Sequence, residues 1–310
     1  MRNAITEAAI AQGACSIGIA RCAPVPSAVA DSYSRWIADG RHAGMTYLER
    51  YTDIRYNPSL LLEGAKSILV CAFNYFPTQK RSSSLPYIAY YAYGEDYHDV
   101  LRKRLRPVAD IIKTLATGSE CRICVDTAPL LERYWAVQAG IGFIGRHSQL
   151  IVPGTGSYVL LGSIITTAEL EPDEPCRLRC PDNCRRCIDA CPGNAIESDG
   201  HINSRQCLSY LTIEHRGEFP AGTQTSNHLY GCDSCQKACP FNNCTRPTQI
   251  EEFAPSETLL HLTPQQVADM KPNDFSATFR HSAIKRAKLD GLRRNAAALK
   301  PNKNITENRK

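Results

Sequence analysis

Two repeated cysteine blocks constrain this chain more than any other feature. Ten of its fifteen cysteines lie between Cys176 and Cys244, and eight of them form two blocks that end in Cys-x-x-Cys-x-x-x-Cys-Pro. The first block runs over residues 180–192, and the second joins Cys207 to residues 232–240. Such blocks are the signature of a fold with two [4Fe–4S] clusters, in which the fourth cysteine of each block ligates the cluster of the other block. This segment is therefore predicted to carry electrons.

Other uses of these cysteines fit less well. Thiolates are soft ligands that suit iron–sulfur clusters, and a zinc site leaves the x-x-x-Cys-Pro extension unexplained. Disulfides need an oxidising compartment, and the N-terminal residues lack the basic-then-apolar pattern of a signal peptide. One alternative stays open, because three residues separate Cys180 from Cys184 where two are usual. Either the loop has an extra residue or Cys176 replaces Cys180, and we favour Cys180.

The length of 310 residues predicts more than one structural part, because the cysteine region accounts for only about 70 of them. We predict an α/β domain over residues 1–170, a ferredoxin-like iron–sulfur module over 171–246, and a helical basic segment over 247–310 whose last ten residues are disordered. No run of 18 apolar residues occurs, so no membrane-spanning segment is predicted.

Helical and strand patterns alternate in the first part, as is typical of an α/β domain. The predicted helices are Ala4–Gln12, Ala28–Asp39, His98–Ala116 and Pro129–Ala139. The predicted strands are Ser16–Ala20, Ser67–Tyr75, Cys121–Val125 and Tyr158–Thr166. Cys121 and Cys124 resemble a redox pair, but a strand would point their sulfurs to opposite faces, so we interpret them as structural. Near the C-terminus, helices are predicted at Thr263–Met270 and Ser276–Leu299.

Two short acidic motifs are candidates for chemistry. Asp126 follows a predicted strand and precedes the helix predicted from Pro129, a position where α/β folds place ligand crevices. The alternative is that Asp126 only caps that helix. Asp96, Tyr97 and His98 are three adjacent side chains that can exchange protons, although helix capping by Asp96 explains the motif equally well.

Positive charge is concentrated at the C-terminus. Residues 271–310 contain eleven Lys and Arg against three acids, a net charge of +8, and the preceding residues sum to −3. A basic end on a slightly acidic body indicates an anionic macromolecular partner, although a solvated charged face is the plain alternative. We expect the helix over residues 279–299 to dock its apolar side chains and to turn five cations outward to a nucleic-acid backbone. These cations are Lys285, Arg286, Lys288, Arg293 and Arg294.

Taken together, these motifs resemble the epoxyqueuosine reductase family, whose members complete the synthesis of queuosine in tRNA. The resemblance covers about residues 1–245 in order. The matching segments are Arg55-x-x-Pro58, Gly64–Ser67, Asp96–His98, Val125–Arg133, Gly140–Ser148, Cys187–Pro192, Arg205–Glu214 and Tyr230–Pro240. The chain departs from the family by the extra residue after Cys180 and at the C-terminus, where many members continue into helical repeats.

The resemblance implies a cobalamin between the N-terminal domain and the iron–sulfur module. It assigns one cluster to Cys180, Cys184, Cys187 and Cys239, and the other to Cys191, Cys207, Cys232 and Cys235. It assigns the proton-donor role to Asp126, with Asp96, Tyr97 and His98 lining the site. Other expected cobalamin contacts are Arg55, Leu150, Leu161, Ser209 and Asp233.

The chemistry implied by the resemblance is consistent with these parts. Removing an epoxide oxygen takes two electrons and two protons, and a carboxylic acid that donates a proton near neutral pH needs a pKa raised well above 4. A tRNA anticodon stem-loop, an unidentified electron donor, a cytoplasmic location and a monomeric state are expected. The alternatives are a cobalamin-dependent enzyme like the reductive dehalogenases and a plain two-cluster electron carrier.

Overall fold

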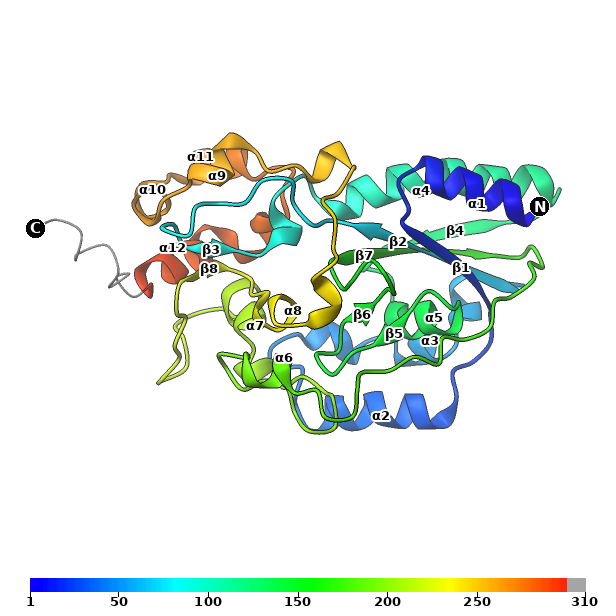
Figure 1. Cartoon of the computed structure of the whole chain (residues 1–310), viewed down its shortest axis with the longest axis horizontal. Helices are drawn as coiled ribbons and strands as arrows, with labels where there is room; N and C mark the ends of the chain where they lie inside the picture. The colour runs from blue at the N-terminus through cyan, green and yellow to red at the C-terminus, as the bar shows by residue number, and fades with distance from the viewer. Residues whose placement is uncertain (300–310) are drawn as a thin grey trace, which may run out of the picture.

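The computed structural model describes residues 1–299, and its centre is a four-stranded antiparallel sheet in the order β1-β2-β7-β4 (Figure 1). The strands are β1 (Ser16–Arg21), β2 (Ser67–Asn74), β4 (Cys121–Cys124) and β7 (Val159–Thr166). All four predicted strands are confirmed. The predicted disorder of the last ten residues lies outside the described part of the chain.

Both faces of this sheet are buried. Leu69, Cys71 and Phe73 of β2 pack into the core on one face, whereas the alternating residues of that strand pack into a second core on the other. The two faces explain why β2 is an almost continuous apolar run. Cys121 and Cys124 likewise belong to different cores, so the expectation that their sulfurs face opposite ways is confirmed.

Helices cover the two faces of the sheet. On one side lie α1 (Arg2–Ala11) and α4 (Tyr97–Leu115), and on the other lie α2 (Ser27–Ala38), α3 (Thr52–Tyr56) and α5 (Glu132–Gln138) (Figure 1). Helix α4 buries apolar side chains at helical spacing against the sheet. These side chains are Val100, Leu101, Leu105, Val108, Ala109 and Ile112.

Helix α5 begins three residues later than predicted. Leu131, not Asp126, is its N-cap residue. The chain from Val125 to Glu132 forms tight turns instead, and Asp126 adopts the left-handed region with φ of 50°. The carboxyl-end rule for parallel sheets also does not apply, because every pairing in this sheet is antiparallel. Asp126 is therefore placed by turn geometry and tertiary contacts.

The cysteine-rich segment consists mainly of loops and short helices. Its helices are α6 (Arg186–Asp189), α7 (Leu208–Ile213) and α8 (Ser234–Lys237). A parallel pairing of β3 (Tyr87–Ile88) with β8 (His228–Tyr230) joins it to the N-terminal part. The small hairpin of β5 (Phe143–Ile144) and β6 (Leu150–Ile151) lies nearby, and its Phe143 packs with Cys239.

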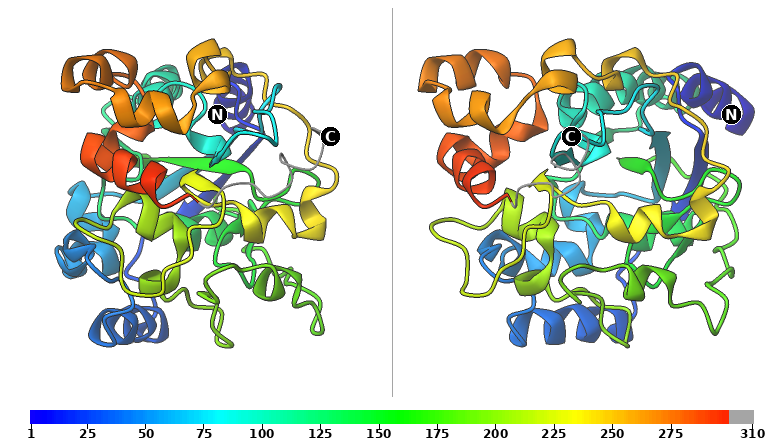
Figure 2. Two further views of the ribbon diagram at one scale, coloured as in Figure 1. Left: turned by 90° about the vertical axis from the view of Figure 1, so that its left-hand side faces the viewer. Right: turned by 60° about the vertical axis from the view of Figure 1, so that its left-hand side comes forward.

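The C-terminal segment forms a group of short helices away from the sheet (Figure 2). They are α9 (Glu257–His261), α10 (Pro264–Asp269), α11 (Pro272–Thr278) and α12 (Lys288–Ala297). The prediction for α10 is confirmed, and Thr263 with Gln266 forms a capping box at its start. The prediction of one helix over Ser276–Leu299 is wrong. The chain turns at 279–282 because buried Phe279 and Ile284 both enter the main core, and the Asp96 N–H binds the His281 carbonyl across 2.6 Å.

Short 3-10 helices complete the chain: Thr46–Glu49, Pro58–Leu61, Tyr90–Ala92, Ser204–Gln206, Pro240–Asn242, Glu251–Phe253 and Ala283–Ala287. The main core contains residues from all three predicted parts, including Leu101, Tyr230 and Leu292. The division into three domains stays a prediction. Between residues 1 and 299 no helix is long and apolar enough to cross a membrane.

Candidate active site and cluster-binding cysteines

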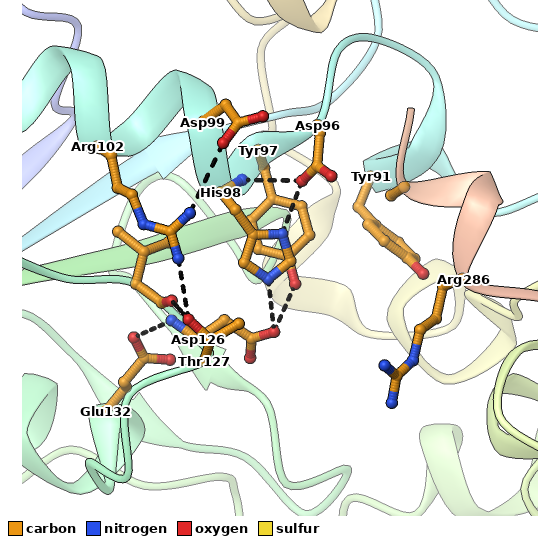
Figure 3. Close-up of polar contacts among 12 residues, drawn as sticks. Tyr91, Asp96, Tyr97, His98, Asp99, Arg102, Asp126, Thr127, Glu132 and Arg286 are labelled. Atoms are coloured by element: carbon orange, nitrogen blue, oxygen red, sulfur yellow. Dashed lines mark hydrogen bonds and ion pairs between the residues drawn. The ribbon is translucent and has the colours of Figure 1, made fainter. Parts of the chain in front are cut away.

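Asp126 lies at the centre of a chain of hydrogen bonds between the β4–α5 turn and the start of α4 (Figure 3). The Tyr97 hydroxyl donates to Asp126 Oδ2 across 2.8 Å, and His98 Nε2 lies 3.1 Å from the same oxygen. The His98 ring stacks on Tyr97, with centroids 4.1 Å apart. Two neighbouring residues of one helix therefore hold one carboxylate oxygen.

Asp96 supports this arrangement from the other side of the imidazole. Its Oδ1 lies 2.6 Å from His98 Nδ1 and also accepts the His98 backbone N–H across 3.1 Å. Lys285 Nζ lies 2.7 Å from Asp96 Oδ2. Asp96 thus caps α4 and also holds the histidine, so the capping interpretation is confirmed, and proton exchange by this motif stays a prediction.

Of the hydrogen-bonded side chains His98 and Asp126, His98 is the one that is protonated at neutral pH. Burial lowers the pKa of His98, but the hydrogen bonds to Asp126 and Asp96 outweigh it and raise the pKa to about 9. Burial raises the pKa of Asp126, but hydrogen bonds from His98 and Tyr97 outweigh it, so the pKa lies below its ordinary value. The expectation of a raised pKa at Asp126 is therefore wrong, because its neighbours stabilise the carboxylate.

Glu132 is a second carboxyl group close to Asp126. Its Oε1 accepts the Asp126 backbone N–H across 2.8 Å. Burial, followed by the negative charge of Asp126, raises the pKa of Glu132 to about 8. This side chain is therefore largely protonated at neutral pH, and it fixes the strained backbone of Asp126.

The Asp126 side chain remains 56% exposed, although much of the protein surrounds it. Arg133 is likewise accessible to solvent while enclosed at longer range. A ligand can therefore reach both side chains from solvent. A hollow of about 480 Å³ lies elsewhere and is lined by Glu95, Arg104, Gln249, Glu251 and Glu252.

Among the described residues, the other expected cobalamin contacts make no hydrogen bond to the side chains of Asp96, Tyr97, His98 and Asp126. Arg55 lies over the Tyr33 ring, 5.8 Å from its centroid, and its Nε is buried without a hydrogen-bond partner among the described residues. Leu150 is buried in β6, Leu161 is partly buried in β7, and Ser209 is partly buried in α7.

Asp233 points its side chain into the protein. The residue is 3% exposed, and its Oδ2 accepts the Tyr87 hydroxyl across 2.6 Å and the Tyr90 backbone N–H across 2.9 Å. Oδ2 is thereby occupied, and the cobalamin contact at Asp233 stays a prediction.

The structure gathers the eight thiols into two sets of four, each drawn from both sequence blocks. In the first set, burial and then the charges of Cys180, Cys239 and Cys184 raise the pKa of Cys187. In the second set, burial and then charges including those of Cys232, Cys207 and Cys191 raise the pKa of Cys235 well above its ordinary value. These two sets coincide with the two predicted ligand sets.

Cys176 also lies near the first set, where it packs with Cys180 and Cys239 around Phe143. The negative charge of the Cys180 thiolate raises the pKa of both Cys187 and Cys239. This favours Cys180 as the first ligand, which stays a prediction.

Within residues 1–299 no group of three or more His, Cys, Asp or Glu side chains is close enough to hold a single metal ion. In a cubane cluster each thiolate binds a different iron, so four sulfurs surround the cluster and do not converge on one point. Two sets of four thiols, each drawn from both sequence blocks, match the four thiolates that each cubane needs.

Of the five cations predicted to face outward, Lys285, Arg286 and Lys288 are exposed as expected, whereas Arg293 and Arg294 are half-buried, so the prediction is wrong for these two. Most of the five also have partners within the protein. Arg286 forms two hydrogen bonds with Glu214, at 2.8 and 2.7 Å, and Arg293 donates to the Met270 carbonyl across 2.6 Å. Arg294 donates to the carbonyls of three residues: Leu211, His215 and Gly217. Apart from Lys285, which binds Asp96, this leaves Lys288 without such a partner in the described residues. The other cations form hydrogen bonds within the protein because the C-terminal segment folds back onto the iron–sulfur part.

The apolar side of the same segment behaves as expected. Ile284, Leu292 and Ala296 are buried, and Leu289 is half-buried. Two residues of the site were missed by sequence reasoning. Glu132 could have been found, because it stands in the matched segment Val125–Arg133. Lys285 carried no local signal, because its partner Asp96 is far away in sequence.

Comparison with known proteins identifies the family. Residues 55–127 match the family model described as "Epoxyqueuosine reductase QueG, DUF1730", and residues 179–242 match "4Fe-4S double cluster binding domain". The second match includes Cys180 and excludes Cys176.

Curated relatives match along nearly the whole chain. An epoxyqueuosine reductase of Cellulophaga algicola is 35% identical over 96% of this chain and 97% of the relative. One of Prochlorococcus marinus is 37% identical over 95% and 97%.

Solved structures agree. A crystal structure of epoxyqueuosine reductase with an epoxyqueuosine-modified tRNA-Tyr stem loop has a TM-score of 0.88 at 30% identity, covering 96% of this chain and 80% of that one. A Bacillus subtilis epoxyqueuosine reductase whose aspartate-bearing catalytic loop is swung out of the active site has the same TM-score and coverage at 29% identity. This chain belongs to the epoxyqueuosine reductase family.

Proposed function

We propose that this chain reduces epoxyqueuosine to queuosine in the anticodon loop of tRNA. The observation that carries the proposal is the hydrogen-bonded chain of Asp126, Tyr97 and His98 in a protein that also gathers two sets of four thiols. An electron carrier needs the thiols but has no use for a solvent-accessible proton chain. A reductase that adds both electrons and protons needs the two together.

The family uses two [4Fe–4S] clusters and a cobalamin, and the residues present fit these groups. We assign one cluster to Cys180, Cys184, Cys187 and Cys239, and the other to Cys191, Cys207, Cys232 and Cys235. The buried, unpartnered Nε of Arg55 is suited to a polar group of a ligand. The remaining assigned cobalamin contacts are Asp96, Tyr97, His98, Leu150, Leu161, Ser209 and Asp233.

The reaction requires a reductant and a proton source. Epoxide, two electrons and two protons give an alkene and water. When bound, a cobalamin supplies a low-valent metal centre that accepts single electrons from the clusters and reduces the substrate. We assign the first proton to Asp126, whose side chain is 56% exposed and can therefore be reached by a substrate. Tyr97 and His98 orient the Asp126 carboxyl group through their contacts with its Oδ2.

The substrate is suited to such a site. The modified base lies in a single-stranded loop, from which a base can be splayed into a pocket, whereas a paired base cannot reach Asp126. The same proposal includes an electron donor that is not identified, a cytoplasmic location, a monomeric state and the division into three domains.

The proposal is tested by turnover of an epoxyqueuosine-containing tRNA stem-loop with protein reconstituted anaerobically with iron, sulfide and cobalamin. Wild-type protein is expected to form queuosine. Asp126→Asn is expected to keep its iron and corrin while losing about 10²- to 10⁴-fold in kcat, because an amide cannot release a proton.

Lys113→Met serves as the matched control, because Lys113 is an exposed cation in the last turn of α4, away from Asp126, and it should retain full activity. Wild-type protein that holds iron but neither binds corrin nor forms queuosine would show that the chain is an electron carrier. A loss below about tenfold in Asp126→Asn would remove Asp126 from the proton-donor role.

A further inference from the structure

Lys285 connects the C-terminal segment to the hydrogen-bonded side chains of Asp96, His98 and Asp126. It lies in the 3-10 helix Ala283–Ala287, and its Nζ is 2.7 Å from Asp96 Oδ2. The Asp96 side chain is only 7% exposed, whereas that of Lys285 is 48% exposed. A cation at the protein surface therefore anchors a buried carboxylate that belongs to the active-site helix α4.

Each oxygen of Asp96 has its own partner. Oδ2 binds Lys285, and Oδ1 faces His98 Nδ1 across 2.6 Å while accepting the His98 backbone N–H. An ammonium that fixes one oxygen prevents the carboxylate from rotating, so the other oxygen stays on the imidazole. Removing Lys285 leaves the buried Asp96 carboxylate without its charged partner on Oδ2, so the carboxylate can reorient.

His98 is held between two carboxylates. Nδ1 meets Asp96, and Nε2 meets Asp126 across 3.1 Å. Both ring nitrogens donate only when the imidazole is protonated, and the raised pKa of His98 agrees with this geometry. The titratable and charged groups around the ring are Asp96, Tyr97, Asp126 and, behind them, Lys285, Glu132 and Arg133.

We propose that Lys285 is a positioning residue for proton transfer: by fixing Asp96, it holds His98 in the orientation that passes a proton from Nε2 to Asp126. The proposal rests on the proposed function, in which Asp126 protonates the epoxide oxygen. It gives the C-terminal segment a role in the active site that its sequence does not indicate.

The proton balance is simple. The Nε2–H bond of His98 breaks, an O–H bond forms on Asp126, and the imidazole becomes neutral. Asp126 gives this proton to the epoxide oxygen as the C–O bonds break and the two electrons of the reduction arrive. Solvent then reprotonates His98 and supplies the second proton of the water that leaves. Lys285 exchanges neither proton nor electron in this sequence.

The rival role for Lys285 is a contact to a tRNA phosphate. A phosphate contact contributes to affinity and to the salt dependence of binding, but not to the chemical step. Positioning instead affects kcat, because a small misplacement of a reacting group can cost up to about 10²-fold in rate. The two roles therefore separate in kinetics.

Three variants test the proposal in the reconstituted full-length enzyme. Lys285→Met should lower kcat by about tenfold or more, with KM for the stem-loop and its salt dependence unchanged. Lys285→Arg keeps a cation and should restore most of kcat. Lys113→Met removes an exposed cation in the last turn of α4, far from Asp96, and should behave as wild type. A raised KM with unchanged kcat in Lys285→Met would overturn the proposal in favour of a phosphate contact, and unchanged kcat and KM would overturn it altogether.

Nuclear magnetic resonance of ¹⁵N-labelled histidine gives a readout that needs no turnover. The chain has eight histidines, and His98→Gln assigns the signal. Asp96→Asn should lower the His98 titration midpoint by about one to three pH units, because a carboxylate beside the ring is lost. The Nδ1 proton should exchange with water faster in Lys285→Met than in wild type or Lys285→Arg. An unchanged exchange rate would overturn the positioning role even if the wild-type protein reduced no tRNA, so the two proposals fail separately.

Discussion

At the scale of single residues, hydrogen bonds and burial determine which carboxyl groups of the site are protonated. Asp126, Asp96 and Glu132 are all carboxyl groups, yet their environments differ. Asp126 and Asp96 each face His98 and remain ionised, whereas Glu132 is half-buried beside Asp126 and takes up a proton more readily. Carboxyl groups whose pKa values are pushed apart are characteristic of sites that move protons.

His98 should make the stability of the protein depend on pH in the alkaline range. Its pKa is raised from 6.5 to about 9 on folding, so the stabilisation is fully present below pH 6.5 and is lost as pH rises through about 9. We expect the melting temperature of wild type to exceed that of His98→Gln at pH 6, and the difference to shrink by pH 10. A difference that grows toward pH 10 would mean that His98 is neutral in the folded protein.

At the scale of elements, the C-terminal segment stabilises the iron–sulfur part. Asn295 of α12 is fully buried, and its Nδ2 donates to the carbonyls of Thr212 in α7 and Leu229 in β8, at 2.7 and 2.9 Å. The second of these bonds joins the strand that pairs with β3. One amide therefore links three elements, and Arg294 beside it adds bonds to the loop after α7.

Asn295→Ala should destabilise the protein, because two buried carbonyls lose their donor. We expect the free energy of unfolding to fall by about 2 to 3 kcal/mol, measured by chemical denaturation of the reconstituted protein. Lys288→Ala, in the same helix but exposed, is the control and should change stability by less than about 0.5 kcal/mol. Equal stability of the two variants would show that water replaces the amide.

At the scale of the whole molecule, the two cysteine blocks are interwoven. Cys239 from the end of the second block joins the set that includes Cys184, and Cys191 from the end of the first block joins the set that includes Cys232. Neither block completes a set alone. The chain between residues 176 and 240 must therefore fold as one unit before either cluster is held.

About eight irons per chain are expected in the reconstituted wild type, four for each cluster. Cys239→Ser should damage the cluster whose other ligands lie in the first block, and Cys191→Ser the cluster whose other ligands lie in the second. Iron analysis with electron paramagnetic resonance of the reduced protein measures which cluster remains. Loss of the same-block cluster in each variant would contradict the crossed assignment.

The sequence by itself determined the two-cluster module, the four sheet strands and the candidates Asp126 and Asp96–His98, because these follow from local spacing and periodicity. It did not determine the protonation of Asp126, the break in the C-terminal helix or the role of Lys285. Each of these depends on partners that are distant in the chain: Asp126 meets His98, the Asp96 backbone meets His281, and Lys285 meets Asp96. The pKa of a side chain and the use of a cation are set by three-dimensional neighbours, so only the tertiary structure could decide them.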